Sequence, residues 1–297
     1  MLATLALVAI TAVWGWTFVL VKEAIQTIPP YEFLAIRFIA AALLLALFIP
    51  REVVAARKPE LRAGASAGVV LGVGYGLQTV GLQYTSATKA GFITGLFVVF
   101  TPPLAALMLR RVPPFSGFLA AGISAGGLLL LTQGRLGSGF NYGDLLVLGC
   151  AVSFAVHVVI LGKIAKAHHA GMLAVLQLGS SGVGFALVSV MTEDLVAPAG
   201  TQVFVALGVT AVLASALAYL VQTWAQKHLS PTRTAVTLAM EPVFAGGAGF
   251  ILLGERLTGG GWLGAGLILG AMLMASRIQD LDSLSDGILG PLASRGG

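Results

Sequence analysis

Apolar runs of about 18–25 residues recur along the whole chain, and each is long enough to cross the hydrocarbon core of a bilayer. Hydrophobic residues make up 57% of the 297 residues and charged residues only 10%, which is not the composition of a soluble domain. We therefore predict an all-α integral membrane protein that is embedded in a lipid bilayer.

The breaks between these runs predict ten transmembrane helices. Proline and charge coincide at the clearest breaks, as at Pro29–Pro30, Pro113–Pro114 and Pro231. The expected spans are roughly 2–22, 31–49, 65–83, 90–109, 116–133, 143–162, 171–191, 202–225, 232–253 and 260–277. The break between the third and fourth spans is the least distinct, because the connecting loop is very short.

The positions of Lys and Arg predict the orientation, since cytoplasmic loops carry an excess of both residues. Twelve would lie on the side of the N-terminus: Arg51, Arg57, Lys58, Arg62, Arg110, Arg111, Lys163, Lys166, Lys227, Arg233, Arg277 and Arg295. Four would lie on the other side: Lys22, Lys89, Arg135 and Arg256. We expect both termini in the cytoplasm of a bacterium, with the chain in its cytoplasmic (inner) membrane. The net charge of +5 follows from these loops and implies no nucleic-acid partner.

The chain contains an internal duplication. Ser86–Gln133 lies over Ser230–Arg277 without a gap when the sequence is displaced by 144 residues. Five spans per half is an odd number, so the second half must enter the membrane in the opposite sense. We expect two inverted five-helix repeats, at 1–138 and 139–278, an arrangement typical of secondary transporters. The polar, Gly/Ser-rich residues 279–297 should form a disordered cytoplasmic tail.

Several short motifs resemble one transporter family. They are Tyr31-Glu32 with Arg37-Phe38, Tyr84 to Ala87, Glu241 to Phe244, and Leu253 to Thr258. Over nearly the whole chain these motifs resemble the EamA branch of the drug/metabolite transporter superfamily, although Arg110 to Pro113 departs from its pattern in the first half. General likeness within the branch is greatest to bacterial exporters of aromatic amino acids. The resemblance implies a secondary transporter that exports small metabolites, with aromatic or apolar amino acids expected.

Two charged residues fall inside expected spans. Glu241 lies near the middle of the ninth span, where a carboxyl group must be protonated, paired or facing a wet cavity. Pro242 disrupts the helix beside it, so Glu241 either binds the freed backbone or binds a substrate or proton, and we expect the first slightly more. Arg37 is expected to snorkel outward or to pair with Glu32, rather than to meet a substrate carboxylate.

Aromatic and amide side chains at mid-depth form a candidate binding pocket, because the interfacial aromatic belt does not explain them. The substrate-binding candidates are Trp14, Trp16, Tyr75, Gln78, Phe97, Phe154, His157, Gln177, Tyr219 and Gln222. Aromatic walls with a few amides would suit a small, partly apolar zwitterion, whereas ordinary core packing is the alternative for each residue. We expect His157 to be a hydrogen-bonded core residue, and a proton relay opposite Glu241 is the less favoured alternative.

Glycines spaced by four residues predict smooth helix faces. These are Gly64, Gly68, Gly72 and Gly76 on the third span, Gly122 and Gly126 on the fifth, and Gly266 and Gly270 on the tenth. Such faces let helices approach closely, and they could equally seat a homodimer.

The remaining residues give little support to other classes of protein. No Gly-Lys-Ser/Thr string follows a Gly-rich loop, so we expect no ATP-driven transport and no cofactor. His168 and His169 are adjacent and cannot share a ligand on one helix face, so we expect no metal site. A membrane-embedded enzyme is disfavoured because Glu241 is the only carboxylate deep in a span. A passive channel for small solutes remains an alternative to a transporter.

Overall fold

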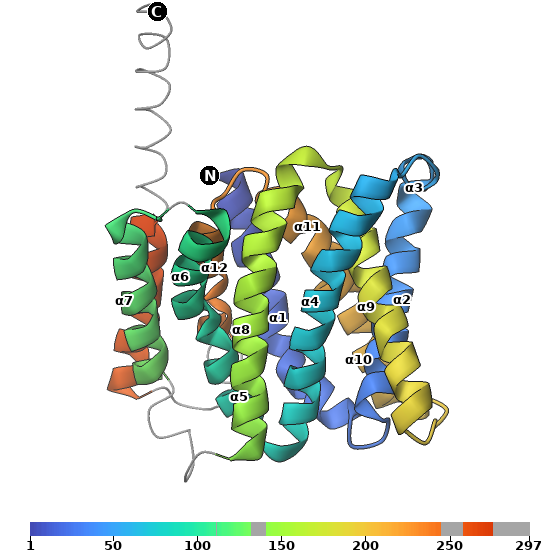
Figure 1. Cartoon of the computed structure of the whole chain (residues 1–297). Helices are drawn as coiled ribbons and strands as arrows, with labels where there is room; N and C mark the ends of the chain where they lie inside the picture. The colour runs from blue at the N-terminus through green and yellow to red at the C-terminus, as the bar shows by residue number, and fades with distance from the viewer. Residues whose placement is uncertain (111, 132–140, 245–257, 276–297) are drawn as a thin grey trace, which may run out of the picture.

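The computed structural model describes residues 1–110, 112–131, 141–244 and 258–275, and all regular structure within them is helical. The α-helices are α1 (Leu2–Ala24), α2 (Pro30–Phe48), α3 (Pro50–Val54), α4 (Lys58–Tyr84), α5 (Ala87–Gly95), α6 (Phe97–Leu109), α7 (Phe115–Leu131), α8 (Tyr142–Ile164), α9 (Ala170–Thr192), α10 (Thr201–Ala211), α11 (Ala218–Ala225) and α12 (Pro231–Leu238), as Figure 1 shows. A π-helix, Val212–Leu217, joins α10 to α11, a 3-10 turn, Ala165–Ala167, follows α8, and one more α-helix covers Gly259–Ala275.

In the described ranges, seven helices are long and apolar enough to cross a membrane, and Phe115–Leu130 and Gly259–Ala275 are shorter apolar helices. These nine segments match nine of the ten expected spans. The ninth expected span begins with α12 and continues beyond Phe244, outside the described residues. The structure likewise does not describe residues 253–257 of the last family motif or the expected tail at 279–297.

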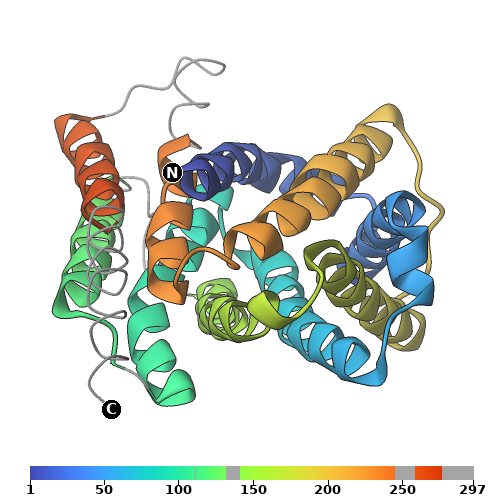
Figure 2. The same ribbon diagram turned by 90° about the horizontal axis from the view of Figure 1, so that it is seen from above.

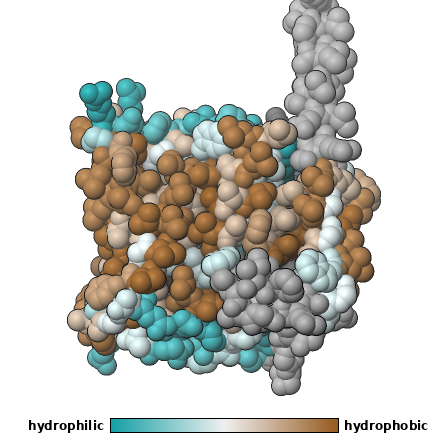
Figure 3. All heavy atoms as spheres, turned by 180° about the vertical axis from the view of Figure 1, so that it is seen from behind, coloured by the Kyte–Doolittle hydropathy of each residue, from teal (hydrophilic) through white to brown (hydrophobic). Residues whose placement is uncertain are grey.

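The surface carries a broad apolar band between two polar rims, as Figure 3 shows for one face. Large hydrophobic side chains are exposed along the helices, including Leu47, Leu187 and Phe204. A continuous apolar belt of this kind is what the hydrocarbon core of a bilayer would cover. The protein is therefore a multi-pass membrane protein.

Two hydrophobic clusters form the interior. The first is built mainly by α2, α4, α9 and α10 and includes Phe33, Phe38 and Leu178. The second is built mainly by α1, α6, α7, α12 and the helix Gly259–Ala275, with Leu7 and Leu128 among its buried residues. Figure 2 shows α7 and Gly259–Ala275 side by side at the edge of the bundle.

The helix ends within the duplicated stretch agree between its two copies. The Ser86 hydroxyl accepts from the Lys89 N–H at the start of α5, and the Ser230 hydroxyl accepts from the Arg233 N–H at the start of α12. The first copy then breaks at Leu96, before α6, and the second breaks at 239–240, before the helical residues 241–244. The last helix of each copy begins at residue 115 or 259, again 144 residues apart.

Equivalent helices run in opposite directions. In Figure 1, α4 leads away from the end where the N-terminus lies, whereas α10, the π-helix and α11 lead back toward it. The duplication also extends further than the sequence comparison detected. Tyr75 in α4 and Tyr219 in α11 are 144 residues apart, and the Tyr219 hydroxyl donates to the Tyr75 hydroxyl at 3.0 Å. The signal for this part is the string Tyr-x-x-Gln-Thr, which occurs at 75–79 and at 219–223.

The glycine faces have different surroundings. On α4, an added Cβ would collide with Leu176 at Gly64 and with the main chain of Gln177 at Gly68, so this face packs closely on α9. By contrast, an added Cβ at Gly122, Gly126, Gly266 or Gly270 would have no described atom within 4 Å. Within the described chain α7 meets Gly259–Ala275 through Gly127 instead, where a Cβ would lie 2.7 Å from the Gly264 carbonyl oxygen. A homodimer that uses the other four glycines stays a prediction.

Candidate functional site

A central cavity of about 60 Å³ lies where the two hydrophobic clusters meet, and Trp14 and Phe154 pack against both clusters. Its aromatic lining residues are Trp14, Phe18, Tyr75, Phe97, Phe154 and Tyr219. Its polar and charged lining residues are Thr17, Arg37, Gln78, Thr79, Thr94, His157, Gln222 and Glu241. A cavity of this size holds a few water molecules, so a larger metabolite would enter only after the surrounding helices separate.

The aromatic walls are joined by ring contacts and one polar anchor. The Tyr75 ring lies 5.2 Å from the Phe154 ring and 6.3 Å from the Tyr219 ring, between centroids. Trp14 lies 5.7 Å from Tyr219, and its indole N–H donates to the Ala214 carbonyl oxygen at 2.8 Å. These contacts hold the rings of four helices around one space.

Eight of the ten expected binding residues line this cavity: Trp14, Tyr75, Gln78, Phe97, Phe154, His157, Tyr219 and Gln222. Trp16 does not, because its side chain is 48% exposed on the outer surface of α1. Residues two apart on an α-helix point about 200° apart, so Trp14 and Trp16 cannot both face the interior. The expectation for Trp16 is wrong. Gln177 lies behind the cavity wall, where its amide contacts His157.

Arg37 faces the protein interior, contrary to the expectation from the sequence. Its side chain is only 3% exposed, and its Nε–H donates to the Ser215 hydroxyl oxygen at 2.8 Å. The guanidinium carbon lies 4.9 Å from the centroid of the Tyr75 ring. Glu32 instead accepts from the Val196 N–H at 2.9 Å, so the expected Arg37–Glu32 pair is absent from the described residues. The reason is the rotation of α2, which turns Arg37 toward the π-helix.

Neither Arg37 nor Glu241, which both line the cavity, has an oppositely charged partner among the described residues. Among the described residues Arg37 has no carboxylate partner, and its Nη1 makes no hydrogen bond. Glu241 follows the break after α12, and its carboxyl group likewise makes no hydrogen bond to any described residue. The sequence favours a hydrogen bond between Glu241 and the backbone groups that Pro242 leaves unbonded. No contact among the described residues supports that expectation. Pro242 does not line the cavity and lies near Gly95 of the equivalent break.

His157 is held by a chain of buried polar groups. Its Nε2 lies 2.8 Å from the Gln177 Oε1, and the Gln177 Nε2 donates to the Thr223 hydroxyl at 3.0 Å. Since the Gln177 oxygen can only accept, His157 Nε2 carries a hydrogen in this arrangement. Next to it, the buried Gln222 Oε1 makes no hydrogen bond within the described chain. No group of three or more His, Cys, Asp or Glu side chains that could hold a metal ion occurs in the described ranges.

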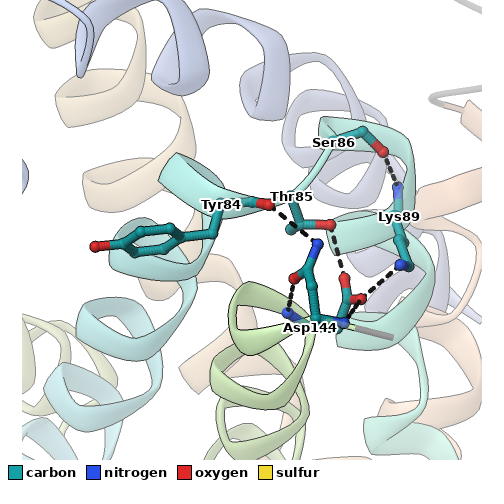
Figure 4. Close-up of polar contacts among 6 residues, drawn as sticks. Tyr84, Thr85, Ser86, Lys89 and Asp144 are labelled. Carbon is teal, nitrogen blue, oxygen red and sulfur yellow. Dashed lines mark hydrogen bonds and ion pairs between the residues drawn. The ribbon is translucent and has the colours of Figure 1, made fainter. Parts of the chain in front are cut away.

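A second polar cluster lies where α5 and α8 begin, at the end of the bundle opposite the N-terminus in Figure 1, and Figure 4 shows its contacts. Asp144 at the start of α8 is fully buried, and its carboxylate lies 2.5 Å from the Lys89 Nζ and accepts from the Thr85 hydroxyl at 2.7 Å. The Asn141 side chain and Asp144 complete a capping box, and the Lys22 ammonium donates to the Thr85 carbonyl oxygen. Sequence reasoning missed this cluster, although Asn-x-x-Asp before an apolar run is a capping signal.

Comparisons with known proteins place the chain among membrane transporters. It is 33% identical to an uncharacterized transporter of Archaeoglobus fulgidus over 277 residues, covering 92% of this chain and 85% of that protein. It is 26% identical to the uncharacterized inner membrane transporter YedA of Escherichia coli, covering 91% and 89%, and 26% identical to the uncharacterized transporter YoaV of Bacillus subtilis, covering 92% and 94%. None of these names gives a substrate.

A solved structure titled "Crystal structure of protein" shares the fold, with a TM-score of 0.74, 20% identity, and coverage of 93% of this chain and 98% of that chain. The sequence model of the EamA-like transporter family matches residues 1–133 and 141–277, which together include the helices that line the cavity. The chain thus belongs to the EamA-like transporter family and is a membrane transporter.

Proposed function

We propose that this protein is a secondary transporter that exports amino acids with aromatic or other apolar side chains across the cytoplasmic membrane. The observation that carries the proposal is the central cavity, in which six aromatic rings surround Arg37 and Glu241. An amino acid offers one positive group, one negative group and an apolar side chain, which complement these three features. Charged residues inside a membrane domain are costly and commonly mark a substrate pathway.

The opposite directions of equivalent helices support a fold of ten helices in two inverted repeats, 1–138 and 139–278. The two ranges matched by the family model fall within these halves. Equivalent residues of a two-fold arrangement can touch only near its axis, so the Tyr75–Tyr219 contact supports an axis that passes near the cavity. Transporters with inverted repeats bind their substrates in this position, at the interface between repeats.

The two ends of the bundle suggest how access alternates. At the end opposite the N-terminus, Lys89 of α5 contacts Asp144 in the first helix of the second half. Its equivalent at the other end is Arg233 of α12, whose Nη2 donates to the Thr4 hydroxyl, in the first helix of the first half, at 3.0 Å. We expect these two contacts to open in turn as the cavity is exposed to one side and then to the other.

The basic residues support a cytoplasmic N-terminus. Figure 1 shows the connections α2–α4, α8–α9 and α11–α12 and the end of α6 at the end of the bundle that holds the N-terminus. These segments and the adjoining helix turns contain nine described Lys and Arg residues: Arg51, Arg57, Lys58, Arg62, Arg110, Lys163, Lys166, Lys227 and Arg233. Only Lys22 and Lys89 lie at the other end, while Arg111, Arg135, Arg256, Arg277 and Arg295 fall outside the described residues. By the positive-inside rule this asymmetry favours a cytoplasmic N-terminus. The inner-membrane name of the Escherichia coli relative favours the cytoplasmic membrane.

The test is substrate exchange by the purified full chain in proteoliposomes, with a panel of amino acids and with or without a pH gradient. We expect exchange to saturate and to favour large apolar amino acids over small or acidic ones. Acceleration by the gradient would indicate proton coupling, and its absence would indicate facilitated diffusion. Flux that does not saturate with any amino acid would instead favour a passive channel.

A further inference from the structure

The guanidinium group of Arg37 is fixed in the cavity wall by neutral partners. Besides the bond to Ser215, its Nη2 donates to the Ala214 carbonyl oxygen at 3.5 Å, and the Tyr75 ring lies beside it. Ala214 and Ser215 belong to the π-helix Val212–Leu217, whose wider turns alter the regular use of backbone carbonyls. The equivalent residues of the first half, 68–73, lie in the regular helix α4, so this anchor exists in one half alone.

The fixed guanidinium has no counter-ion in the part of the chain that the structure describes. Burying a charge is costly unless a group of opposite charge compensates it, and a hydroxyl and a carbonyl oxygen supply only dipoles. In the described chain no carboxylate contacts Arg37, and the Arg37 Nη1 makes no hydrogen bond. The Arg37 side chain lines the cavity. The planar guanidinium can bind the two oxygens of a carboxylate through parallel N–H bonds, and a carboxylate is the anionic group of an amino acid.

The second unpaired charge enters the cavity from the other hydrophobic cluster. Glu241 follows α12, whose Leu238 belongs to the second cluster, whereas Tyr75 beside Arg37 belongs to the first. The two groups therefore belong to segments that pack in different hydrophobic clusters, and both line the cavity. A ligand that bridges them needs an anion at one end and a cation near it.

We infer that Arg37 binds the α-carboxylate of the substrate and Glu241 its ammonium group, so that the protein selects zwitterions over amines and simple acids. This inference rests on the proposed function and assigns a role to each charge. The π-helix positions the Arg37 side chain before the substrate arrives, which lowers the ordering cost of binding. The carboxylate is then the required part of the substrate, and the apolar side chain adds affinity through the aromatic walls.

The experiment measures binding to the purified full chain by ligand-induced thermal stabilisation, with L-phenylalanine, phenethylamine and 3-phenylpropionate as probes. Phenethylamine lacks the carboxylate, and 3-phenylpropionate lacks the ammonium group, while all three keep the ring. We expect each of the two analogues to bind at least roughly 10-fold more weakly than phenylalanine, since each leaves one buried charge unpaired.

Variants assign the effect to Arg37. Arg37→Gln should weaken phenylalanine binding roughly 10- to 100-fold and leave phenethylamine binding unchanged, while Arg37→Lys should keep part of the preference. The matched control is Arg51→Gln, which removes an exposed arginine of α3 and should change neither ligand.

The outcomes separate the inference from the proposed function. Phenethylamine that binds as well as phenylalanine would overturn the inference while leaving an amine-accepting transporter, and so would an Arg37→Gln variant with equal losses for both ligands. No stabilisation by any probe, and none by other amino acids, would overturn the amino-acid proposal and the inference with it. If Arg37→Gln does not fold, the comparison of the three probes on the wild-type chain still decides whether the protein selects zwitterions.

Discussion

Trp14 and Trp16 provide a matched pair for testing the cavity, because they lie two residues apart on α1 and face opposite ways. The Trp14 side chain lines the cavity and anchors to Ala214, whereas Trp16 is 48% exposed on the outer surface. We predict that Trp14→Leu weakens transport of phenylalanine more than transport of alanine. Trp16→Leu should leave both rates near those of the wild type.

The magnitude follows from the apolar contact that a substrate ring would lose. A loss of about 60 Å² of contact corresponds to about 1.5 kcal/mol at 25 cal/mol per Å². That free energy is roughly a tenfold rise in the half-saturating concentration of phenylalanine. Alanine has no ring to lose this contact, so its half-saturating concentration should change by less than about twofold by the same relation.

The assay is uptake of labelled phenylalanine or alanine into proteoliposomes over a range of substrate concentrations. Both variants should purify as monodisperse protein, since leucine keeps an apolar side chain at each position. Equal losses for the two substrates in Trp14→Leu would refute the reasoning and point to core packing. A larger effect of Trp16→Leu than of Trp14→Leu would contradict the position of the cavity.

Three further predictions test other parts of the structure. Glu241→Gln keeps the size of the side chain but removes its charge, so phenylalanine exchange should need a roughly 10-fold higher concentration; unchanged exchange would leave Glu241 without a role in binding. Lys89→Ala leaves the fully buried Asp144 carboxylate without its cation and should lower the free energy of unfolding by about 3 kcal/mol in chemical denaturation, whereas Lys58→Ala at the exposed rim should not. Topology reporters fused at Pro59 and Lys166 should read cytoplasmic and one at Glu193 external; an external signal at Lys166 would contradict the orientation.

The sequence predicted the position of most helices, because run length and hydropathy determine which segments cross the membrane. The two stretches that match 144 residues apart begin alike, since Ser86 caps α5 and Ser230 caps α12, and the helix breaks at 239–240, just before Pro242. The inverted five-helix repeat stays a prediction. Hydropathy does not determine how each helix is rotated. A helix that is apolar on all sides gives little periodicity to show which face is buried. The expectations for Trp16 and Arg37 failed for this reason.

The remaining parts of the site depend on packing that a single sequence does not show. The π-helix Val212–Leu217 contains no proline or glycine from which it could be predicted, yet it supplies both hydrogen-bond acceptors of Arg37. The ion pair of Lys89 and Asp144 joins residues 55 positions apart, one in α5 and one in α8. Such contacts follow from the way in which helices pack together, which the hydropathy of each helix does not determine.

Counterflow tests the central claim, transport of amino acids by alternating access, most directly. Proteoliposomes that contain the full chain are loaded with unlabelled phenylalanine and diluted into buffer with a trace of labelled phenylalanine. Obligatory return of the loaded site predicts that the label rises transiently above its equilibrium level inside the vesicles and then falls. A label that only approaches equilibrium, at a rate independent of the internal phenylalanine, would contradict the account and indicate a channel.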